Sequence, residues 1–393
     1  MKYVSVNEMV SIEMEADKTG LTYEIMMENA GNALAEVILE EYSSFPTQGV
    51  LGLVGSGNNG GDTLVALSCL AKRGWRTGAY IIRERPQGDP LVNRYLQSGG
   101  NILVAKLDSK YERLQKMLKD YGIILDGVLG TGIKLPLKAE LAKIFDLIKA
   151  NLSTEVRKPI VVAVDCPSGV DCDSGEAASE CIPADLTVTM AAVKQGLFKF
   201  PAYNYVGNLR VVGIGLPGNG ESLESWRAIR SFIPEENWVK QNLPPRPLDS
   251  HKGTFGTALI VAGCLKYSGA SLLAGKAAYR IGAGLVTLAI PSILHAALSG
   301  HFIEATWQPL PHSNGFISSQ ASHVILDNIA RVTAVLLGPG FGLEKTTEDF
   351  LRGLFEHSSH KNYQGSHNQP TLLPPLVIDA DGLKLLSKIQ ESP

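Results

Sequence analysis

Apolar residues along the chain follow two different spacings, which predict two kinds of element. Short apolar runs bounded by Gly, Pro, Asn or Asp predict buried strands, and longer stretches with apolar residues three or four positions apart predict amphipathic helices. Residues 7–42 show the helical spacing. Beyond them the predicted strands are 50–54, 79–83, 101–107, 122–128, 159–165, 186–192 and 209–214, and the predicted helices are 63–73, 89–98, 109–120 and 138–150.

Strands and helices that alternate in this way favour a parallel sheet with helices on both faces. The sequence therefore predicts a three-layer α/β domain over residues 1–217. In such sheets ligands bind beyond the carboxyl ends of the strands, so motifs at strand ends carry the most functional weight. The apolar face of residues 7–42 also suits burial against a second subunit, and we expect a homo-oligomer.

A second alternating pattern follows a Pro-rich connector, Leu243-Pro244-Pro245-Arg246-Pro247. We predict that residues 218–250 are a linker and the start of the second domain, and that residues 251–393 form another α/β domain. Its predicted elements are strands 257–263, 284–290, 333–338 and 376–379 and helices 271–281 and 292–299. Residues 357–375, rich in His, Ser, Asn and Gln, are predicted to be a surface insertion.

Composition excludes several classes of protein. The 393 residues are 45% apolar and include 40 glycines, which suits two globular domains with many tight turns. The net charge of −3 and the lack of a cationic stripe argue against nucleic-acid binding. No apolar run reaches the ~20 residues of a spanning helix, and no signal-peptide core is present, so we expect a cytoplasmic protein without membrane attachment. The five cysteines form no CxxC pair, which argues against zinc and fits reduced thiols.

The glycine-rich run Gly55-Ser56-Gly57-Asn58-Asn59-Gly60-Gly61-Asp62 follows the first predicted strand. Such a turn lets the backbone approach a ligand and directs free N–H groups at anionic oxygen. The Gly-x-Gly-x-x-Gly pattern alone is weak evidence for dinucleotide binding. Two Asn and one Asp add oxygens that could bind a cation or a ligand hydroxyl.

Three further motifs stand at strand ends. Asp126 precedes a second glycine turn in Leu-Asp-Gly-Val-Leu-Gly-Thr-Gly, and Asp165 and Ser168 end the run Val-Val-Ala-Val-Asp-Cys-Pro-Ser-Gly. A later strand leads to Lys194. In a parallel sheet these residues converge with the glycine-rich run at one edge. Taken one at a time, each Asp is more often a helix N-cap than a catalyst, and a lone Lys is usually solvated.

Other readings of these motifs remain open. A P-loop is excluded because the glycine-rich run lacks the Lys-Ser/Thr pair. An NAD-dependent oxidoreductase stays a rival, with Glu84 near the position of an acidic ribose ligand, although Arg83-Glu84-Arg85 has the character of a solvated turn. We interpret Cys166 as a small buried core residue and not as a nucleophile, since no His lies near it in sequence.

The four motifs, in this order and spacing, resemble the NAD(P)H-hydrate epimerase family over residues 1 to about 217. The resemblance implies a Rossmann-like fold and interconversion of the R and S hydrates of NADH and NADPH. By this resemblance the hydrate is bound by Asn58, Asn59, Gly60, Gly61, Asp62, Gly130, Thr131, Gly132, Ile133, Lys134, Leu135 and Pro136. Asp165 would be the catalytic residue at the reacting ring, and Asn59, Asp126 and Ser168 would bind K⁺.

The second half resembles the ADP- or ATP-dependent NAD(P)H-hydrate dehydratase, a ribokinase-like domain that uses Mg²⁺. The matching segments are His251-Lys252-Gly253, Tyr267-Ser268-Gly269-Ala270, Gly282-Ala283-Gly284-Leu285-Val286-Thr287, Gly338-Pro339-Gly340-Phe341-Gly342 and Val377-Ile378-Asp379-Ala380-Asp381. Ala270 and Gly342 match hydrate-contacting positions. The family's His-Pro-Gly-Glu segment and its Gly-x-Gly-Asp motif with the catalytic Asp do not occur in the 393 residues. We therefore expect a C-terminally truncated, incomplete dehydratase domain without activity.

Two alternatives to epimerisation follow from the same residues. A non-catalytic binding module would keep the fold with an altered pocket, whereas both Asn-Asn-Gly-Gly-Asp and Asp-Cys-Pro-Ser-Gly are intact here. An NAD-dependent oxidoreductase would transfer hydride to a second substrate. The sequence by itself assigns no phosphate-binding Arg, so it does not choose between the NADH and NADPH hydrates.

Overall fold

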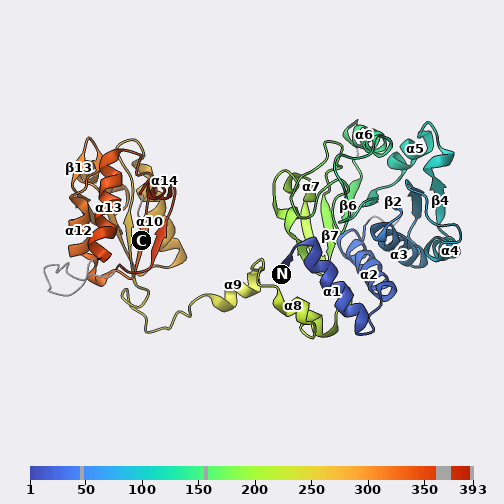
Figure 1. Cartoon of the computed structure of the whole chain (residues 1–393), viewed down its shortest axis with the longest axis horizontal. Coiled ribbons are helices and arrows are strands. Elements are labelled where there is room, and N and C mark those ends of the chain that lie inside the picture. Colours follow the sequence, from blue (N-terminus) through green and yellow to red (C-terminus); the bar gives the residue numbers. More distant parts are fainter. Residues whose placement is uncertain (45–47, 155–157, 360–372, 390–393) are drawn as a thin grey trace. The chain divides into compact units, whose positions relative to one another are not determined.

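The computed structural model describes residues 1–44, 48–154, 158–359 and 373–389, and divides the chain into two compact units (Figure 1). The first unit is Met1–Leu243 and the second is Pro244–Pro393. The division falls inside the segment 218–250, where the short helices α8 (Glu224–Ala228) and α9 (Glu236–Asn242) also lie. Most of the segment 357–375 lies outside the described residues, but its first positions belong to a helix.

The first unit is built on a seven-stranded parallel sheet in the order β4-β3-β2-β5-β6-β7-β9. The order reverses between β2 and β5, which in doubly wound sheets opens a crevice at the carboxyl ends of the strands. The strands are β2 (Val50–Val54), β3 (Thr77–Ile81), β4 (Asn101–Val104), β5 (Ile123–Gly127), β6 (Ile160–Val164), β7 (Leu186–Met190) and β9 (Asn208–Val212). A small parallel pair, β1 (Tyr3–Val4) with β8 (Val193–Lys194), joins the N-terminus to the turn after β7.

Helices cover both faces of this sheet, because the alternating residues of each strand point to opposite sides. Val50 and Val54 of β2 lie in one core with α1 (Val6–Lys18), α2 (Tyr23–Glu41) and α3 (Asn58–Lys72). Leu51 and Leu53 lie in a separate core with α5 (Glu112–Asp120) and α6 (Ala139–Thr154). Helix α4 is Pro90–Gln97. Figure 1 shows α1, α2, α3 and α4 on one side of the sheet and α5 and α6 on the other. The predicted three-layer α/β fold is confirmed.

Helix α3 begins at Asn58, five residues before the predicted start at 63. Sequence propensity did not indicate this start, because two Asn and two Gly are poor helix formers. Close packing explains the glycines. A Cβ on Gly60 would lie 2.1 Å from the Gly55 carbonyl oxygen, and a Cβ on Gly55 would lie 1.9 Å from the Val128 carbonyl oxygen. The first turn of α3 is therefore pressed against the ends of β2 and β5.

The second unit has its own five-stranded parallel sheet in the order β12-β11-β10-β15-β16. The strands are β10 (Thr257–Val261), β11 (Leu285–Pro291), β12 (Thr306–Leu310), β15 (Ala334–Leu337) and β16 (Leu376–Ile378), with a small hairpin of β13 (His312–Ser313) and β14 (Phe316–Ile317). Strand β12 was not predicted, because Pro309 interrupts its apolar pattern, which an edge strand tolerates.

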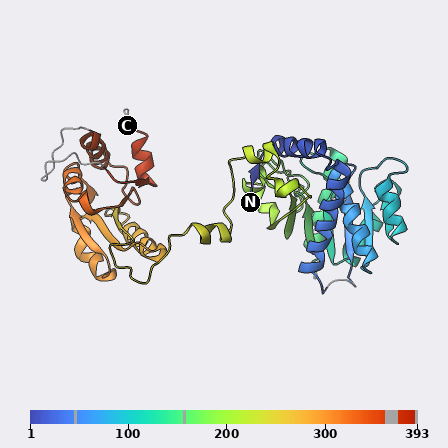
Figure 2. The same ribbon diagram turned by 90° about the horizontal axis from the view of Figure 1, so that it is seen from below.

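Helices also lie on both sides of the second sheet (Figures 1 and 2). One core contains α12 (Ala321–Asp327), α13 (Lys345–Ser359) and α14 (Asp381–Leu386), and the other contains α10 (Gly269–Ile281) and α11 (Ser292–Leu298). Helices α12 and α13 were missed by the sequence analysis. In the described part of the chain, none of the helices combines the length and apolar character needed to cross a bilayer.

Candidate active site

Five of the predicted strand-end residues of the first unit line one cavity, namely Asn58, Asn59, Asp62, Asp165 and Lys194. The cavity has a volume of about 290 Å³ and is bounded by α1, α2, the first turn of α3 and the ends of β6 and β7. Its lining residues are Glu13, Tyr23, Met26, Met27, Ala30, Asn58, Asn59, Asp62, Thr131, Asp165, Met190, Lys194 and Ile214. We call this space the reaction cavity.

Asp165 stands directly after β6 in the left-handed backbone region, at φ +66°. Its Oδ1 accepts hydrogen bonds from the Met190 amide at 2.9 Å and from the Thr189 hydroxyl at 3.1 Å, and it also accepts from Lys194 Nζ. The left-handed conformation suits Asp and Asn better than most residues. The carboxylate is therefore held in one orientation and is not an N-cap.

Lys194 is 1% exposed, and its ammonium group is ion-paired with Asp165. The same Nζ donates to the Met190 carbonyl at 2.9 Å. Burial lowers the pKa of Lys194, but the Asp165 carboxylate outweighs this effect and leaves the pKa raised, so the lysine stays cationic. The prediction of a solvated Lys194 was wrong, because the β1–β8 pairing fixes the turn that carries it inside the unit.

Two more carboxyl groups, of Asp62 and Glu13, line the same cavity. Burial raises the pKa of Asp62 well above its usual range, and the nearby Asp165 and Glu13 raise it further. Burial likewise raises the pKa of Glu13. Three carboxyl groups thus face one buried ammonium group, and ionisation of Asp62 or Glu13 is disfavoured there. The cavity contains an anionic, positioned Asp165 next to a carboxyl that retains its proton to a higher pH.

The raised pKa of Asp62 predicts a pH-dependent stability. A carboxyl with a higher pKa in the folded state contributes stability below its unfolded pKa, and this contribution is lost as pH rises through the folded pKa. Asp62→Asn cannot ionise, so its first unit should unfold at a higher temperature than wild type near neutral pH, by an amount that shrinks toward about pH 4. Melting curves across this range test the prediction, and a difference that does not change with pH would contradict it.

A second buried group lies where β5 and β6 end. Asp126 Oδ2 accepts from the Ser168 amide at 2.8 Å, whereas Oδ1 is buried without a hydrogen-bond partner among the described residues. Burial raises the pKa of Asp126. The Asn59 amide group donates to the carbonyl oxygens of Val164 and Leu129, and the Ser168 hydroxyl accepts from the Leu129 amide at 2.9 Å. Carboxylate, amide and hydroxyl oxygens are ligands of hard cations, so an unpaired Asp126 oxygen fits a bound cation.

A second cavity, of about 250 Å³, lies between the two glycine-rich turns. We call it the glycine-loop cavity. Its lining residues are Ser56, Gly57, Asn58, Asn59, Arg83, Val128, Leu129, Gly130, Thr131, Gly132 and Ile133. Arg85 supports the first turn by donating to the carbonyl oxygens of Gly55 at 2.9 Å and Gly57 at 3.1 Å, and it pairs with Asp89.

Not every predicted site residue lines these two cavities. Gly60 packs against Gly55, and Gly61 packs against Met27, so both allow close helix packing. Asp126, Ser168, Leu135 and Pro136 do not line either cavity, and Lys134 lines a third cavity. Ala270 and Gly342 belong to the second unit, where the Gly342 amide donates to Asp381 at 3.0 Å.

Sequence reasoning missed Glu13, Tyr23 and Arg83, and it gave Lys194 no role. Glu13 and Tyr23 come from α1 and α2, which the pattern marked only as packing surface. The sequence contains one indication that Glu13 and Tyr23 belong to a site, which is that each lies close along the chain to the apolar face of its helix. A charged residue at such a position is solvated in most proteins, so this signal is weak.

Comparison with known proteins adds independent information. The family described as YjeF-related protein N-terminus matches residues 23–196, and the family described as NAD(P)H-hydrate dehydratase matches residues 258–393. The chain is 32% identical to the bifunctional NAD(P)H-hydrate repair enzyme of Moorella thermoacetica, over 92% of this chain and 65% of that protein. The enzyme of the same name from Pyrobaculum aerophilum is 32% identical, over 100% of this chain and 72% of that protein.

The chain thus spans 65% and 72% of the length of these two relatives. Among solved structures, the ADP/ATP-dependent NAD(P)H-hydrate dehydratase of Bacillus subtilis, co-crystallised with ATP and Mg²⁺, is 26% identical. That alignment covers 38% of this chain and 46% of that chain, with a TM-score of 0.29.

Proposed function

This chain belongs to the family of bifunctional NAD(P)H-hydrate repair enzymes, and from that membership we propose that its first unit interconverts the R and S hydrates of NADH and NADPH. The single observation that carries the proposal is the meeting of Asp165, Lys194 and Asp62 in the reaction cavity. An anionic carboxylate and a carboxyl that retains its proton supply a base and an acid at one place.

The chemistry requires one proton to be given and one to be taken. The C6 hydroxyl of the hydrate leaves as water when it is protonated, with the N1 lone pair forming a double bond to C6. Water then adds to C6 from the other face and loses a proton, which inverts the centre. Asp165, oriented by Lys194 and the Met190 amide, takes or returns the proton at this oxygen. Asp62 is the proposed donor to the departing hydroxyl.

We propose that Asn59, Asp126 and Ser168 hold K⁺. The buried Asp126 oxygen without a partner and the neutral oxygens beside it support this assignment. The ion would supply a fixed positive charge beside the glycine turns, where a charged ligand is expected. The hydrate would extend from the reaction cavity along Asn58, Thr131 and Gly132 into the glycine-loop cavity.

The proposal is tested by following the ratio of the R and S hydrates after a single hydrate has been purified. Addition of the 393-residue chain should accelerate relaxation of the ratio, and K⁺ should support faster relaxation and a higher melting temperature than Li⁺ at equal ionic strength. A relaxation rate equal to that of buffer would refute the epimerase assignment. Equal rates and melting temperatures in the two salts would refute the K⁺ site alone.

For the second unit we propose the dehydratase class, acting on the S hydrate with ADP or ATP and Mg²⁺, because residues 258–393 match that family. The expectation that the 393 residues have no dehydratase activity stays a prediction. The same assay supplemented with nucleotide and Mg²⁺ checks it, and consumption of the S hydrate with formation of NADH or NADPH would show that the prediction is wrong.

A further inference from the structure

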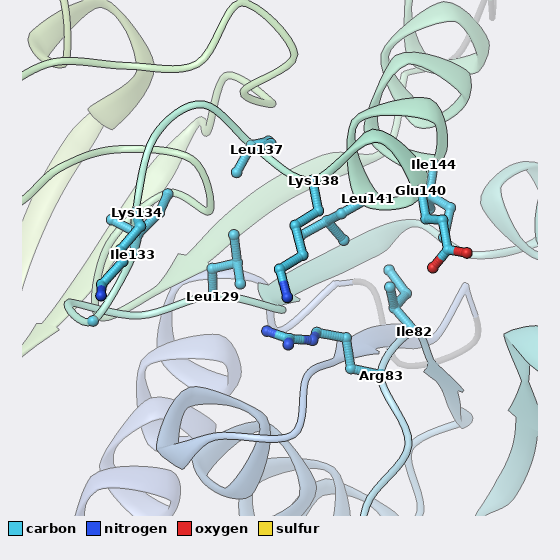
Figure 3. A pocket seen from close by; sticks show the side chains of 11 residues that line it. Ile82, Arg83, Leu129, Ile133, Lys134, Leu137, Lys138, Glu140, Leu141 and Ile144 are labelled. Atoms are coloured by element: carbon cyan, nitrogen blue, oxygen red, sulfur yellow. The ribbon is translucent and has the colours of Figure 1, made fainter.

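A third cavity of the first unit, of about 410 Å³, combines an apolar floor with exposed cationic side chains (Figure 3). The apolar floor is formed by Ile82, Leu129, Ile133, Leu137, Leu141 and Ile144. The cations are Arg83, which follows β3, and Lys134 and Lys138, which precede α6. Glu140 is the single acidic residue in the lining. An apolar floor beneath clustered cations suits an aromatic base that carries phosphate.

The cations of this cavity lack anionic partners. In Figure 3 the guanidinium of Arg83 and the ammonium of Lys138 extend toward the same space, and the Glu140 carboxylate lies to one side. No ion pair or hydrogen bond of the Arg83, Lys134 or Lys138 side chain occurs within residues 1–44, 48–154 and 158–243. The neighbouring Arg85, by contrast, is paired with Asp89 at 2.8 Å. All three side chains are exposed, so water weakens their mutual repulsion, and a bound anion would offset what remains.

The third cavity, the glycine-loop cavity and the reaction cavity adjoin one another, because neighbouring cavities share lining residues. The third cavity shares Arg83 and Ile133 with the glycine-loop cavity, which in turn shares Asn59 and Thr131 with the reaction cavity. Together they follow the carboxyl ends of the strands from β7 to β3, four steps across the sheet. At about 4.8 Å per step this path is about 19 Å long. A path of this length accommodates an extended dinucleotide and exceeds what one nicotinamide ring would occupy.

The position of Arg83 indicates which part of a dinucleotide would lie there. In doubly wound sheets the residue after the second strand lies beside the adenosine ribose, where an acidic residue binds the 2′-hydroxyl and an Arg accommodates a 2′-phosphate. Here β3 is the strand that follows the glycine-rich turn and α3, and Arg83 comes two residues after its end. Glu84 does not line the cavity and instead pairs with Lys106 at 3.0 Å.

We propose that the third cavity binds the adenosine end of the hydrate and that Arg83 and Lys138 bind its ribose 2′-phosphate, so that this protein prefers NADPH hydrate over NADH hydrate. This inference rests on the proposed epimerase function for the identity of the substrate. The apolar floor packs against the adenine, and the glycine turns receive the diphosphate at the N-terminus of α3. Charge-assisted bonds from Arg to phosphate supply the selectivity.

The test compares the binding of NADP⁺ and NAD⁺ to the full chain by calorimetry. Arg83→Gln and Lys138→Gln should each weaken NADP⁺ binding by about tenfold, the loss of one charge-assisted contact, and leave NAD⁺ binding within about twofold. Lys143→Gln removes the same charge from an exposed position of α6 outside the cavity and is the matched control. Because all three changes lie in the first unit, nucleotide bound by the second unit does not alter the comparison.

Two results would overturn the proposal. The first is an equal loss of affinity for NADP⁺ and NAD⁺ in the two Gln variants, which would indicate that these cations bind the diphosphate. The second is an unchanged affinity for both nucleotides. The ratio of kcat/KM for the NADPH hydrate over the NADH hydrate should fall in Arg83→Gln by the same factor as the NADP⁺ affinity. If the wild-type chain epimerises neither hydrate but loses NADP⁺ selectivity in Arg83→Gln, the proposed function fails and the phosphate assignment holds.

Discussion

Asp165→Asn should lower the rate of hydrate epimerisation by roughly 10²- to 10⁴-fold, the range that a positioned acid or base contributes. The amide cannot take the proton from the attacking water, although it fills the same space. Asn also tolerates the φ of +66° at this position, so the backbone should keep its conformation. The measurement is the initial rate at which a purified R or S hydrate relaxes to the mixture, at saturating hydrate.

The variant should bind the hydrate with little change in affinity, because residue 165 lines neither the glycine-loop cavity nor the third cavity, which would hold the rest of the dinucleotide. Asp146→Asn is a suitable control, since Asp146 is an exposed residue of α6 that lines none of the three cavities. A melting curve shows whether Asp165→Asn remains folded at the assay temperature. Full activity in a folded Asp165→Asn protein would rule out the proposed role.

Lys194→Met should destabilise the first unit by about 3–5 kcal/mol, the usual cost of removing one partner of a buried ion pair. The change leaves the Asp165 carboxylate without its ammonium partner next to two further carboxyl groups, of Asp62 and Glu13. The double variant Asp165→Asn/Lys194→Met should recover most of the loss, because it removes both charges together. The melting transition of the first unit, followed separately from that of the second, measures both effects.

Lys116→Met, at an exposed position of α5, controls for the loss of one lysine and should change stability by less than about 0.5 kcal/mol. If Lys194→Met melted at the wild-type temperature, the ion pair would not be a stabilising contact. If the double variant were as unstable as the sum of the single variants, Lys194 would stabilise the unit through contacts other than Asp165.

The sequence predicted the layered fold of the first unit because its signals are local. The strands β2, β5 and β6 are apolar runs that end in or are followed by Gly or Asp, and the right-handed crossovers of a parallel sheet bring these ends to one edge. That rule alone placed Asn59, Asp126, Asp165 and Ser168 near one another before any coordinates were known. The second unit was predicted less well, since β12 contains Pro309 and its residues are partly exposed.

Periodicity and the glycines of the tight turns are enough to indicate which residues lie at the carboxyl edge of the sheet. The partners of these residues, in contrast, depend on how distant elements pack in the folded unit. Lys194 is buried because β8 pairs with β1, a strand almost two hundred positions away in the chain. Arg83 and Lys138 line one cavity because the segment after β3 and the segment before α6 meet there. Local pattern specifies the face on which a side chain lies, whereas the charge and burial around it depend on elements distant in sequence.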